Sequence, residues 1–316
     1  MSNAEGSQSA LRAAGPVAEV LLGVSGVLAV GGTVIFVGMM VLLTLALRRR
    51  AGRVNERWWV LGGGVAFPAV VLTALFVYSE RHKPPWRMAP PQDALIVSVT
   101  AHMWWWEVRY RDPRSGAEVV TANELRIPVA RPVYFGLSSA DVIHSFWVPS
   151  LGGKMDMVPG RVQHLQLQAN RPGVWRGQCA EFCGEQHARM ALHVVAEDTA
   201  SFDAWLAAQA RPATIAAEGA GDAAIGQGRR AFLAHRCNAC HTVRGVSEER
   251  SLGPDLTHVG SRLHLGAGTV VNEPAQLAAW VAHTQQLKPG ARMPSSGERI
   301  DEADLQAIAT WLSHLR

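Results

Sequence analysis

The sequence predicts a chain of three parts: a two-helix transmembrane hairpin, an all-β Greek-key barrel and an all-α domain. Two long apolar runs lie near the N-terminus, short segments of alternating hydrophobicity fill the middle, and amphipathic stretches with helical spacing follow them. A length of 316 residues is sufficient for such a division. We place the parts at residues 1–90, 91–208 and 223–316, with a linker at residues 209–222.

The hairpin is predicted from the two apolar runs. The first spans residues 17–47 with Glu19 as its single charge, and it exceeds the roughly 20 residues that cross a bilayer. We therefore expect it to tilt or to extend past the lipid. The second run spans residues 58–79 and contains Pro68, which a membrane helix tolerates. Aromatic residues at its two ends are typical of membrane interfaces.

Five arginines indicate the orientation of the hairpin. They occupy the short loop between the runs: Arg48, Arg49, Arg50, Arg53 and Arg57. Short cytoplasmic loops are enriched in Lys and Arg, so both termini and everything after residue 80 are expected outside the cytoplasm. A cleaved signal peptide is the alternative interpretation of the first run. That run is too long, however, and it ends in arginines instead of small residues.

The middle and last parts differ in periodicity. Pro, Gly, Asn and Asp separate six segments of apolar alternation, which is typical of an antiparallel β-sandwich or barrel. These segments are residues 95–100, 104–110, 125–129, 133–137, 162–167 and 192–195. A helix near residues 200–210 closes this part, and an Ala-, Gly- and Pro-rich linker follows. Three further helices are expected at residues 224–237, 274–283 and 301–315.

The net charge of +4 does not indicate a nucleic-acid partner. Residues 1–89 carry nine Lys/Arg and four Asp/Glu, residues 90–210 carry ten and twelve, and residues 211–316 carry eleven and ten. The excess therefore belongs to the membrane part. The remainder is nearly neutral and contains no nucleic-acid-binding motif.

The middle part contains a cluster of potential metal ligands. Cys179, Cys183, His187 and Met190 fall within twelve residues, and His144 comes from an upstream strand end. Sulfur with imidazole selects copper or zinc, and the thioether favours copper because it is a poor zinc ligand. One upstream His with a downstream ligand loop is the blue-copper arrangement. Here the loop holds two cysteines, and two thiolates can bridge two copper ions.

Two alternatives exist for this cluster. One is a zinc site, and the other is a Cys179–Cys183 disulfide beside a bystander His and Met. Two close cysteine pairs on an exported chain often form disulfides. His164 and His193 lie in strand-like stretches, and we expect them to be packed or surface residues instead of ligands.

These motifs resemble those of a known family. Cys-x-Glu-x-Cys-x-x-x-His-x-x-Met, the upstream Asp-Val-x-His-Ser, the segment from Pro149 to Arg161 and the run from His102 to Trp106 resemble the CuA domain of cytochrome c oxidase subunit II. The resemblance covers roughly residues 17–205. It implies a cupredoxin-like barrel with a binuclear CuA centre, in a bacterial inner membrane protein with both termini and both domains in the periplasm.

The resemblance also implies residue roles. Cys179 and Cys183 would bridge both coppers, with His144 and Met190 on one copper and His187 and the carbonyl of Glu181 on the other. The Glu181 side chain would reach a magnesium ion at the boundary with subunit I. Electrons would enter at Trp104, and at least one neighbouring tryptophan should be core. Glu56 resembles a glutamate near a proton pathway, although a solvated loop charge is an equal alternative.

The last part carries the sequence Cys237-Asn-Ala-Cys240-His241, the attachment motif of a c-type haem. A thioredoxin-like pair is the alternative, but it lacks a βαβ context and leaves the histidine unexplained. Met293 is the best candidate for the sixth ligand. His258 and His264 are rival ligands, and Arg262 is either a propionate partner or a surface residue. The arrangement resembles class I cytochrome c.

These expectations combine into an electron-transfer function. A soluble donor, either a cytochrome c or a high-potential iron–sulfur protein, would reduce the covalent haem c, and electrons would continue through CuA to subunit I. Subunit I, with further membrane subunits, would reduce O2 in a proton-pumping cytochrome c oxidase. One alternative is the equivalent subunit of a CuA-type nitric oxide reductase, although Glu181 and Glu56 favour the oxidase. Another is a membrane-anchored copper-delivery protein, which would not need a covalent haem.

Overall fold

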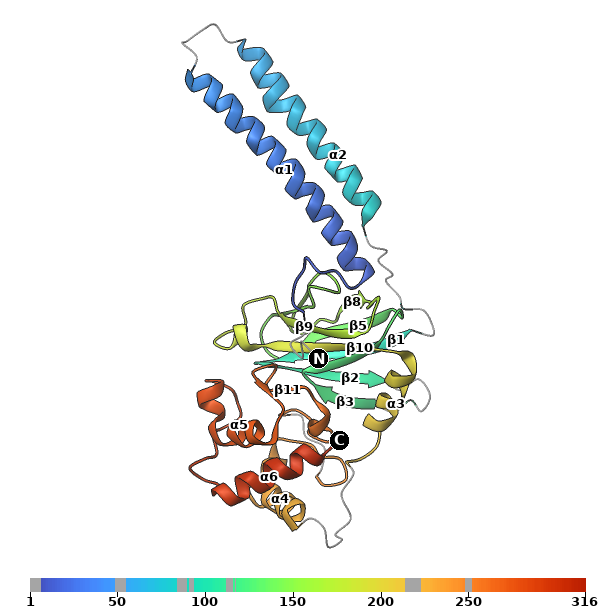
Figure 1. Ribbon diagram of the computed structural model, residues 1–316, viewed down its shortest axis with the longest axis vertical. Helices are drawn as coiled ribbons and strands as arrows, with labels where there is room; N and C mark the ends of the chain where they lie inside the picture. Colours follow the sequence, from blue (N-terminus) through green and yellow to red (C-terminus); the bar gives the residue numbers. More distant parts are fainter. Residues whose placement is uncertain are drawn as a thin grey trace.

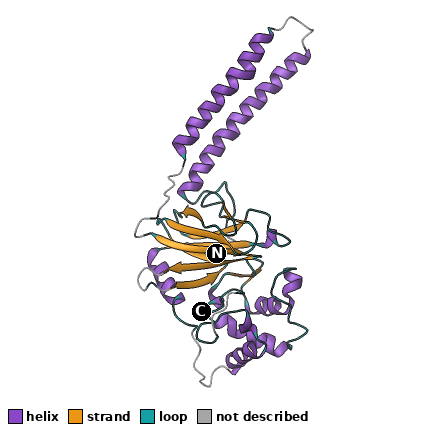
Figure 2. Cartoon of the chain, turned by 180° about the vertical axis from the view of Figure 1, so that it is seen from behind, coloured by secondary structure: helices purple, strands orange, loops and turns teal. Residues whose placement is uncertain are grey.

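The computed structural model describes residues 7–48, 55–83, 90, 94–111, 116, 118–213, 223–247 and 252–316. A helical hairpin extends from one end of a β domain, and a smaller helical domain packs at the other end (Figures 1 and 2). The three predicted parts are therefore present in the predicted order. Three of the loop arginines (Arg49, Arg50 and Arg53) and most of the expected linker (214–222) lie outside the described residues.

The hairpin consists of α1 (Pro16–Arg48), the π-helical segment η1 (Trp58–Ala66) and α2 (Phe67–His82). Both apolar helices are long and apolar enough to cross a membrane, with hydropathies of 2.4 and 2.2. At a rise of about 1.5 Å per residue, α1 exceeds the hydrocarbon thickness. Pro68 lies just after the π-helical segment. Proline has no backbone N–H, so the usual helical hydrogen bond to the carbonyl of Gly64 cannot form. The helix accommodates this by widening its preceding turns.

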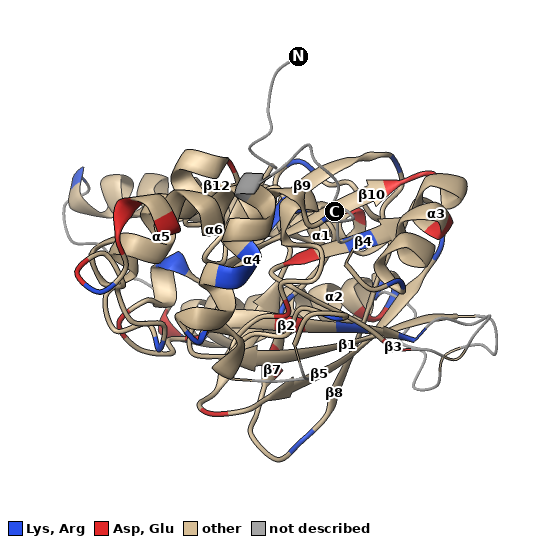
Figure 3. Ribbon diagram, turned by 90° about the horizontal axis from the view of Figure 1, so that it is seen from below, with Lys and Arg blue, Asp and Glu red and all other residues tan. Residues whose placement is uncertain are grey.

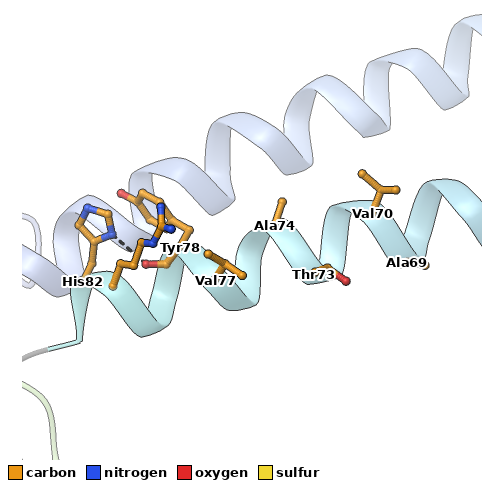
Figure 4. Close-up of a pocket in the computed structure, with 8 residues that line it drawn as sticks. Ala69, Val70, Thr73, Ala74, Val77, Tyr78 and His82 are labelled. Atoms are coloured by element: carbon orange, nitrogen blue, oxygen red, sulfur yellow. Dashed lines mark hydrogen bonds between the residues drawn. The ribbon is translucent and has the colours of Figure 1, made fainter.

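One face of α2 carries a shallow apolar groove. It is lined by Ala69, Val70, Thr73, Ala74, Val77, Tyr78, Arg81 and His82 (Figure 4). His82 Nδ1 lies 2.8 Å from the carbonyl oxygen of Tyr78, so the polar atoms gather at the end nearest the β domain. An apolar surface of this kind suits a lipid or helical neighbour within a membrane.

The β domain is a sandwich of two five-stranded sheets with orders β3-β2-β1-β5-β8 and β4-β10-β9-β6-β7. Its strands are β1 (Leu95–His102), β2 (Trp105–Arg111), β3 (Glu118–Ala122), β4 (Glu124–Pro128), β5 (Val133–Ser139), β6 (His144–Trp147), β7 (Met155–Met157), β8 (Gln163–Leu167), β9 (Gly173–Cys179) and β10 (Ala191–Glu197). The expectation of a wholly antiparallel domain is wrong, because β1 pairs with β5 and β4 with β10 in parallel. The chain leaves β1 and returns beside it by a long connection, and local alternation cannot reveal this direction.

The core lies between the two sheets. Along β1, Leu95, Val97 and Val99 are buried whereas Ile96 is exposed, as the period of two requires. The rings of Trp106 and Phe146, from opposite sheets, meet edge to face with centroids 5.8 Å apart. Trp106 is therefore the core tryptophan expected in this run.

The residues before α1 attach the hairpin to the β domain. The amide of Ala14 donates to Ser150 O at 2.7 Å, and the amide of Asn170 donates to Ala14 O at 2.8 Å. A Cβ at Gly15 would lie 2.2 Å from Gln168 O, so only glycine permits this approach. The start of α1 is thereby fixed against the sandwich. At the other end, α3 (Thr199–Gln209) begins at Asp198, whose carboxylate caps the helix by accepting the Ser201 amide.

The C-terminal domain contains α4 (Ala223–Ala234), η3 (Cys237–Ala239), η4 (Val259–Ser261), β11 (His264–Leu265), β12 (Val270–Val271), α5 (Pro274–Leu287) and α6 (Glu302–His314). The three predicted helices are present. α5 continues past the predicted end at His283, which has non-helical φ/ψ, and the two-stranded hairpin β11–β12 was not anticipated. Strands of two residues are too short to leave a periodic signal.

Gly228 lies where α4 crosses α6. A Cβ there would be 2.1 Å from Ala307 O and 2.6 Å from Trp311 Cβ, whereas a Cβ at Gly226 would meet only Arg230 Nη1 at 3.3 Å. We therefore expect Gly228→Ala to destabilise the domain by about 1–3 kcal/mol through overpacking. Gly226→Ala, the matched control, should be neutral or stabilise by up to about 1 kcal/mol. Hydrogen exchange of the α4 and α6 amides measures both values, and equal exchange in the two variants would contradict the close crossing.

Candidate metal and haem sites

The copper-ligand candidates converge at one end of the sandwich. β6 begins at His144 and β9 ends at Cys179, while the following loop and η2 (His187–Arg189) carry the other candidates back to β10. The adjacent strands β6 and β9 pair at Phe146 and Cys179, which places His144 beside the loop. Sheet pairing thus joins residues that lie 35 positions apart in the sequence.

Each sulfur lies near two other potential ligands. Cys179 Sγ is 3.8 Å from His144 Nδ1 and 3.1 Å from the carbonyl oxygen of Glu181. Cys183 Sγ is 3.7 Å from His187 Nδ1 and 3.8 Å from Met190 Sδ. The two cysteines are free thiols, so the structure contains no disulfide between them. This is a six-donor pocket of sulfur, imidazole and carbonyl oxygen.

Most of the donor residues lie inside the domain, whereas Glu181 and His187 are partly exposed. His144, Cys179, Cys183 and Met190 are all buried. The donor atoms of His144, Cys179 and Cys183 lie within 4.8 Å of one another, and among the described residues this is the one His/Cys/acidic cluster compact enough to hold a metal ion. Neither His164, which is exposed on β8, nor His193, which is buried on β10, belongs to this cluster.

Asp141 orients the first imidazole, and the sequence did not single it out. Asp141 Oδ1 accepts a hydrogen bond from His144 Nε2 at 2.8 Å, which leaves Nδ1 free to face Cys179. Asp141 Oδ2 also accepts the amide of Met103 at 2.8 Å. The carboxylate therefore joins the turn before Trp104 to the metal pocket. The signal available in the sequence was the acidic residue three positions before the histidine.

The pocket stabilises negative charge on sulfur. Hydrogen bonding with Cys183 lowers the pKa of the Cys179 thiol far below its usual range, and the same pairing raises the pKa of Cys183. Burial lowers the pKa of His144, but hydrogen bonds to Cys179 and Asp141 outweigh this effect and raise it overall. A metal ion bound between the two groups would displace the proton from His144, because a histidine binds metal only as the neutral imidazole.

The carbonyl of Glu181 faces the sulfur of Cys179, whereas its side chain lies near Lys154. Lys154 Nζ lies 3.8 Å from Glu181 Oε2 and 3.0 Å from Asp156 Oδ1. All three side chains are at least partly exposed, so this charged group sits at the edge of the domain next to the copper pocket. Glu56, the other acidic residue considered above, is exposed just before η1.

The three consecutive tryptophans have different environments. The indole Nε1 of Trp104 donates to the carbonyl of Cys183 at 2.8 Å, so this half-buried ring contacts the metal loop directly. Trp105 stacks on His102 with centroids 4.3 Å apart, and Trp106 is fully buried. Of the three tryptophans, Trp104 is the one whose side chain is hydrogen-bonded to the metal loop.

The haem-attachment motif follows α4 and includes η3. His241 Nδ1 lies 2.8 Å from the carbonyl of Pro254, which can only accept, so Nδ1 carries the proton and Nε2 keeps its lone pair. Burial lowers the pKa of His241, which favours the neutral imidazole that binds iron. A Cβ at Gly253 would lie 2.6 Å from Cε1 of His241, so glycine is required beside the ring.

The remaining candidates around the motif separate into two groups. Met293 packs against the core of this domain, whereas His258 Nε2 is 3.0 Å from Arg211 O and His264 stacks on His193 of the β domain. The two rival histidines are therefore engaged elsewhere. Arg262 is partly buried, and its buried Nε has no hydrogen-bond partner among the described residues. An unsatisfied buried guanidinium N–H of this kind fits an anionic group such as a haem propionate.

Known proteins match both regions. The family described as "Cytochrome C oxidase subunit II, periplasmic domain" matches residues 113–197, and the family described as "Cytochrome c" matches residues 225–316. The cytochrome c oxidase subunit 2 of Alkalihalophilus pseudofirmus is 35% identical over 246 residues, which cover 78% of this chain and 67% of that protein. The chain belongs to the cytochrome c oxidase subunit 2 family. The family resemblance inferred from the motifs is therefore confirmed.

Two further relatives have lower sequence identity. The cytochrome c oxidase subunit 2 of Bacillus subtilis is 30% identical over 234 residues, covering 71% of this chain and 63% of that protein. The crystal structure of the periplasmic domain of subunit II from Bradyrhizobium japonicum is 30% identical, with a TM-score of 0.35, and covers 38% of this chain. Subunit II with a cytochrome c domain supports an electron-transfer role, with copper in the first domain and haem c in the second.

Proposed function

We propose that this subunit II is where electrons enter a proton-pumping cytochrome c oxidase. Electrons from a soluble donor would pass by way of covalent haem c and a binuclear CuA centre to subunit I, where O2 is reduced to water. The oxidase activity belongs to the whole complex, and this chain supplies the path for electrons. The observation that carries the proposal is the pocket around Cys179 and Cys183, because two thiols with these neighbours suit two coppers.

The distances support the proposed distribution of ligands. In that assignment His144 and Met190 bind one copper, and His187 and Glu181 O bind the other. Cys179 contacts one donor of each set, His144 and Glu181 O, and Cys183 also contacts one donor of each set, Met190 and His187. A sulfur that bridges two metals requires this placement. When bound, a thiolate-bridged copper pair supplies a one-electron site with fixed ligand geometry.

In the second domain, Cys237 and Cys240 would hold the haem through thioethers, and His241 and Met293 would bind its iron. Cys237 is partly buried and Cys240 is exposed, which is compatible with a haem that has one edge covered by protein and one edge open to solvent. Two axial ligands leave no position for a substrate, so this site suits electron transfer and not catalysis. Arg262 would neutralise a propionate.

We also propose that both termini and both domains lie on the periplasmic side of a bacterial inner membrane. The contacts of Ala14 and Gly15 with the β domain support this, because they require the start of α1 and the sandwich to share one side. The described arginines Arg48 and Arg57 lie at the far end of the hairpin. Subunit I and further membrane subunits would cover the groove on α2, and the exposed edge at Glu181 would contribute to a magnesium ion there.

Metal analysis and turnover test the proposal together. The purified complex should contain two coppers in this subunit for each haem c, and it should consume O2 with a reduced donor. A ratio below two after full metallation would contradict the binuclear centre. Turnover with nitric oxide but not O2 would contradict the oxidase assignment in favour of a nitric oxide reductase.

A further inference from the structure

Trp104 lies between the two cofactor-bearing loops. On one side, a Cβ at Gly184, the residue after Cys183, would lie 3.1 Å from Cζ2 of Trp104. On the other side, a Cβ at Gly290 would lie 3.4 Å from Cη2 of the same ring. Both glycines have positive φ, +109° and +76°, so both loops place bare backbone against the indole. Gly290 is three residues before Met293, and the ring therefore connects the two loops by direct contact.

Lys288 fixes the second loop in this position. Its Nζ donates to the carbonyls of Trp104 at 2.9 Å, Arg189 at 2.8 Å and Gly266 at 2.8 Å. Trp104 and Arg189 belong to the β domain, while Gly266 belongs to the cytochrome c domain. An ammonium group has three N–H donors, so these three carbonyls use every donor of Lys288. The residue is almost fully buried, at 3% exposure. Burial lowers the pKa of Lys288 to about 7, and only the ammonium form satisfies all three carbonyls.

Other contacts also cross the boundary between the two domains. The amide of Ala191 donates to Ala267 O at 3.0 Å, and the amide of Leu263 donates to Glu124 Oε2 at 2.7 Å. The rings of His193 and His264 stack with centroids 4.0 Å apart. The contacts on the β domain come from β4, β10 and the copper loop, and Figure 1 shows β11 and α5 against that domain. The boundary is thus a specific interface rather than a flexible linkage.

We propose that Lys288 is a positioning residue that holds the cytochrome c domain over Trp104, so that the chain's own second domain covers the surface where electrons enter the copper domain. This inference rests on the proposed function and deepens it. An external donor would then meet the cytochrome c domain and not Trp104. Three acceptors from two domains define one relative position, because each N–H must find its own carbonyl. A tethered partner held in this way needs little electrostatic steering.

The surface charge agrees with this arrangement. Residues 90–210 carry twelve acidic and ten basic side chains, which gives the β domain little net charge to attract a separate cationic protein. Seen from below, Lys and Arg lie interspersed with Asp and Glu over the two domains (Figure 3). The docked domain makes a strongly acidic collecting face unnecessary.

Lys288→Met in the full oxidase complex tests the proposal. The variant keeps the side-chain length and removes all three donors. We expect peptides containing the amides of Ala191 and Leu263 to exchange hydrogen roughly tenfold faster. Electron transfer from photoreduced haem c to copper should slow by about tenfold or more, because small displacements reduce rates strongly. The visible haem spectrum and the near-infrared copper band should not change.

Lys83→Met is the control, since Lys83 is exposed and its one ion pair among the described residues is with Glu80 at the end of α2. The proposal would be overturned if Lys288→Met showed the same hydrogen exchange and the same electron-transfer rate as the wild type. Faster hydrogen exchange with an unchanged electron-transfer rate would overturn it as well. If Lys288→Met does not accumulate, Lys288→Gln retains two donors and should show a smaller change in the same direction; no change would again overturn it. Absence of transfer in the wild type would instead contradict the proposed function, while hydrogen exchange would still report on Lys288.

Discussion

Replacing Cys183 by serine should remove the copper centre while leaving haem c intact. Serine oxygen is a poor bridge between soft metal ions, and Cys179 alone cannot hold two of them. Mutation of a residue that only supports a metal ligand typically lowers metal affinity by roughly 10–100-fold. Loss of a bridging ligand should therefore lower the copper affinity by about 100-fold or more. We expect loss of the near-infrared copper band, fewer than two coppers per haem, and oxygen consumption reduced to background. Absorption spectra and metal analysis of the purified complex measure these changes.

Met157→Leu is the matched control for this variant. Met157 is buried on β7 directly opposite His144, but it is not among the proposed ligands. A volume-conserving change at this site should leave the copper band in place. Retention of both coppers in Cys183→Ser would show that the two sulfurs do not bridge them. Loss of the haem spectrum together with the copper band would show that the two sites are not independent.

Met293→Ala should open the sixth position of the haem iron. The alanine side chain cannot reach the iron, so the reduced haem should bind carbon monoxide, which the wild-type haem should not. Loss of the thioether should also lower the reduction potential, within the roughly 0.8 V range that axial ligands control. Electrons would then leave the domain with altered driving force. A carbon monoxide difference spectrum and a redox titration of the complex measure both effects.

The rival histidines provide the comparison for this prediction. His258→Ala and His264→Ala should keep a six-coordinate haem, because His258 Nε2 faces the carbonyl of Arg211 and His264 stacks on His193. If carbon monoxide binds to either histidine variant and not to Met293→Ala, the assignment of Met293 is wrong. His264→Ala should in addition loosen the contact between the two domains, which hydrogen exchange at Leu263 would detect.

Local patterns in the sequence predicted most of the fold and drew attention to the ligand residues. The two apolar runs predicted α1 and the π/α segment that follows the loop, and helical spacing predicted α4, α5 and α6. Strand direction was beyond such patterns: the parallel pairing of β1 with β5 depends on a distant connection. The short hairpin β11–β12 was missed because pairs of residues carry no period.

The candidate sites divide in the same way. Cys179, Cys183, His187 and Met190 are neighbours in sequence because one loop must supply several ligands, so a spacing pattern was enough to suggest copper. The role of Asp141 became visible only when β6 was placed beside the loop, since its partner His144 Nε2 points away from the sulfur atoms. Sequence determined the kinds of chemistry that the chain carries.

Only the tertiary structure decided how the two cofactor regions meet. Lys288 and Trp104 are separated by 184 positions, and no periodicity or motif joins them. Their contact depends on a buried ammonium finding three carbonyls, and backbone carbonyls are the same in every residue. The sequence can indicate which side chains bind metal, but which backbone carbonyls meet a given donor is decided only when the chain is folded.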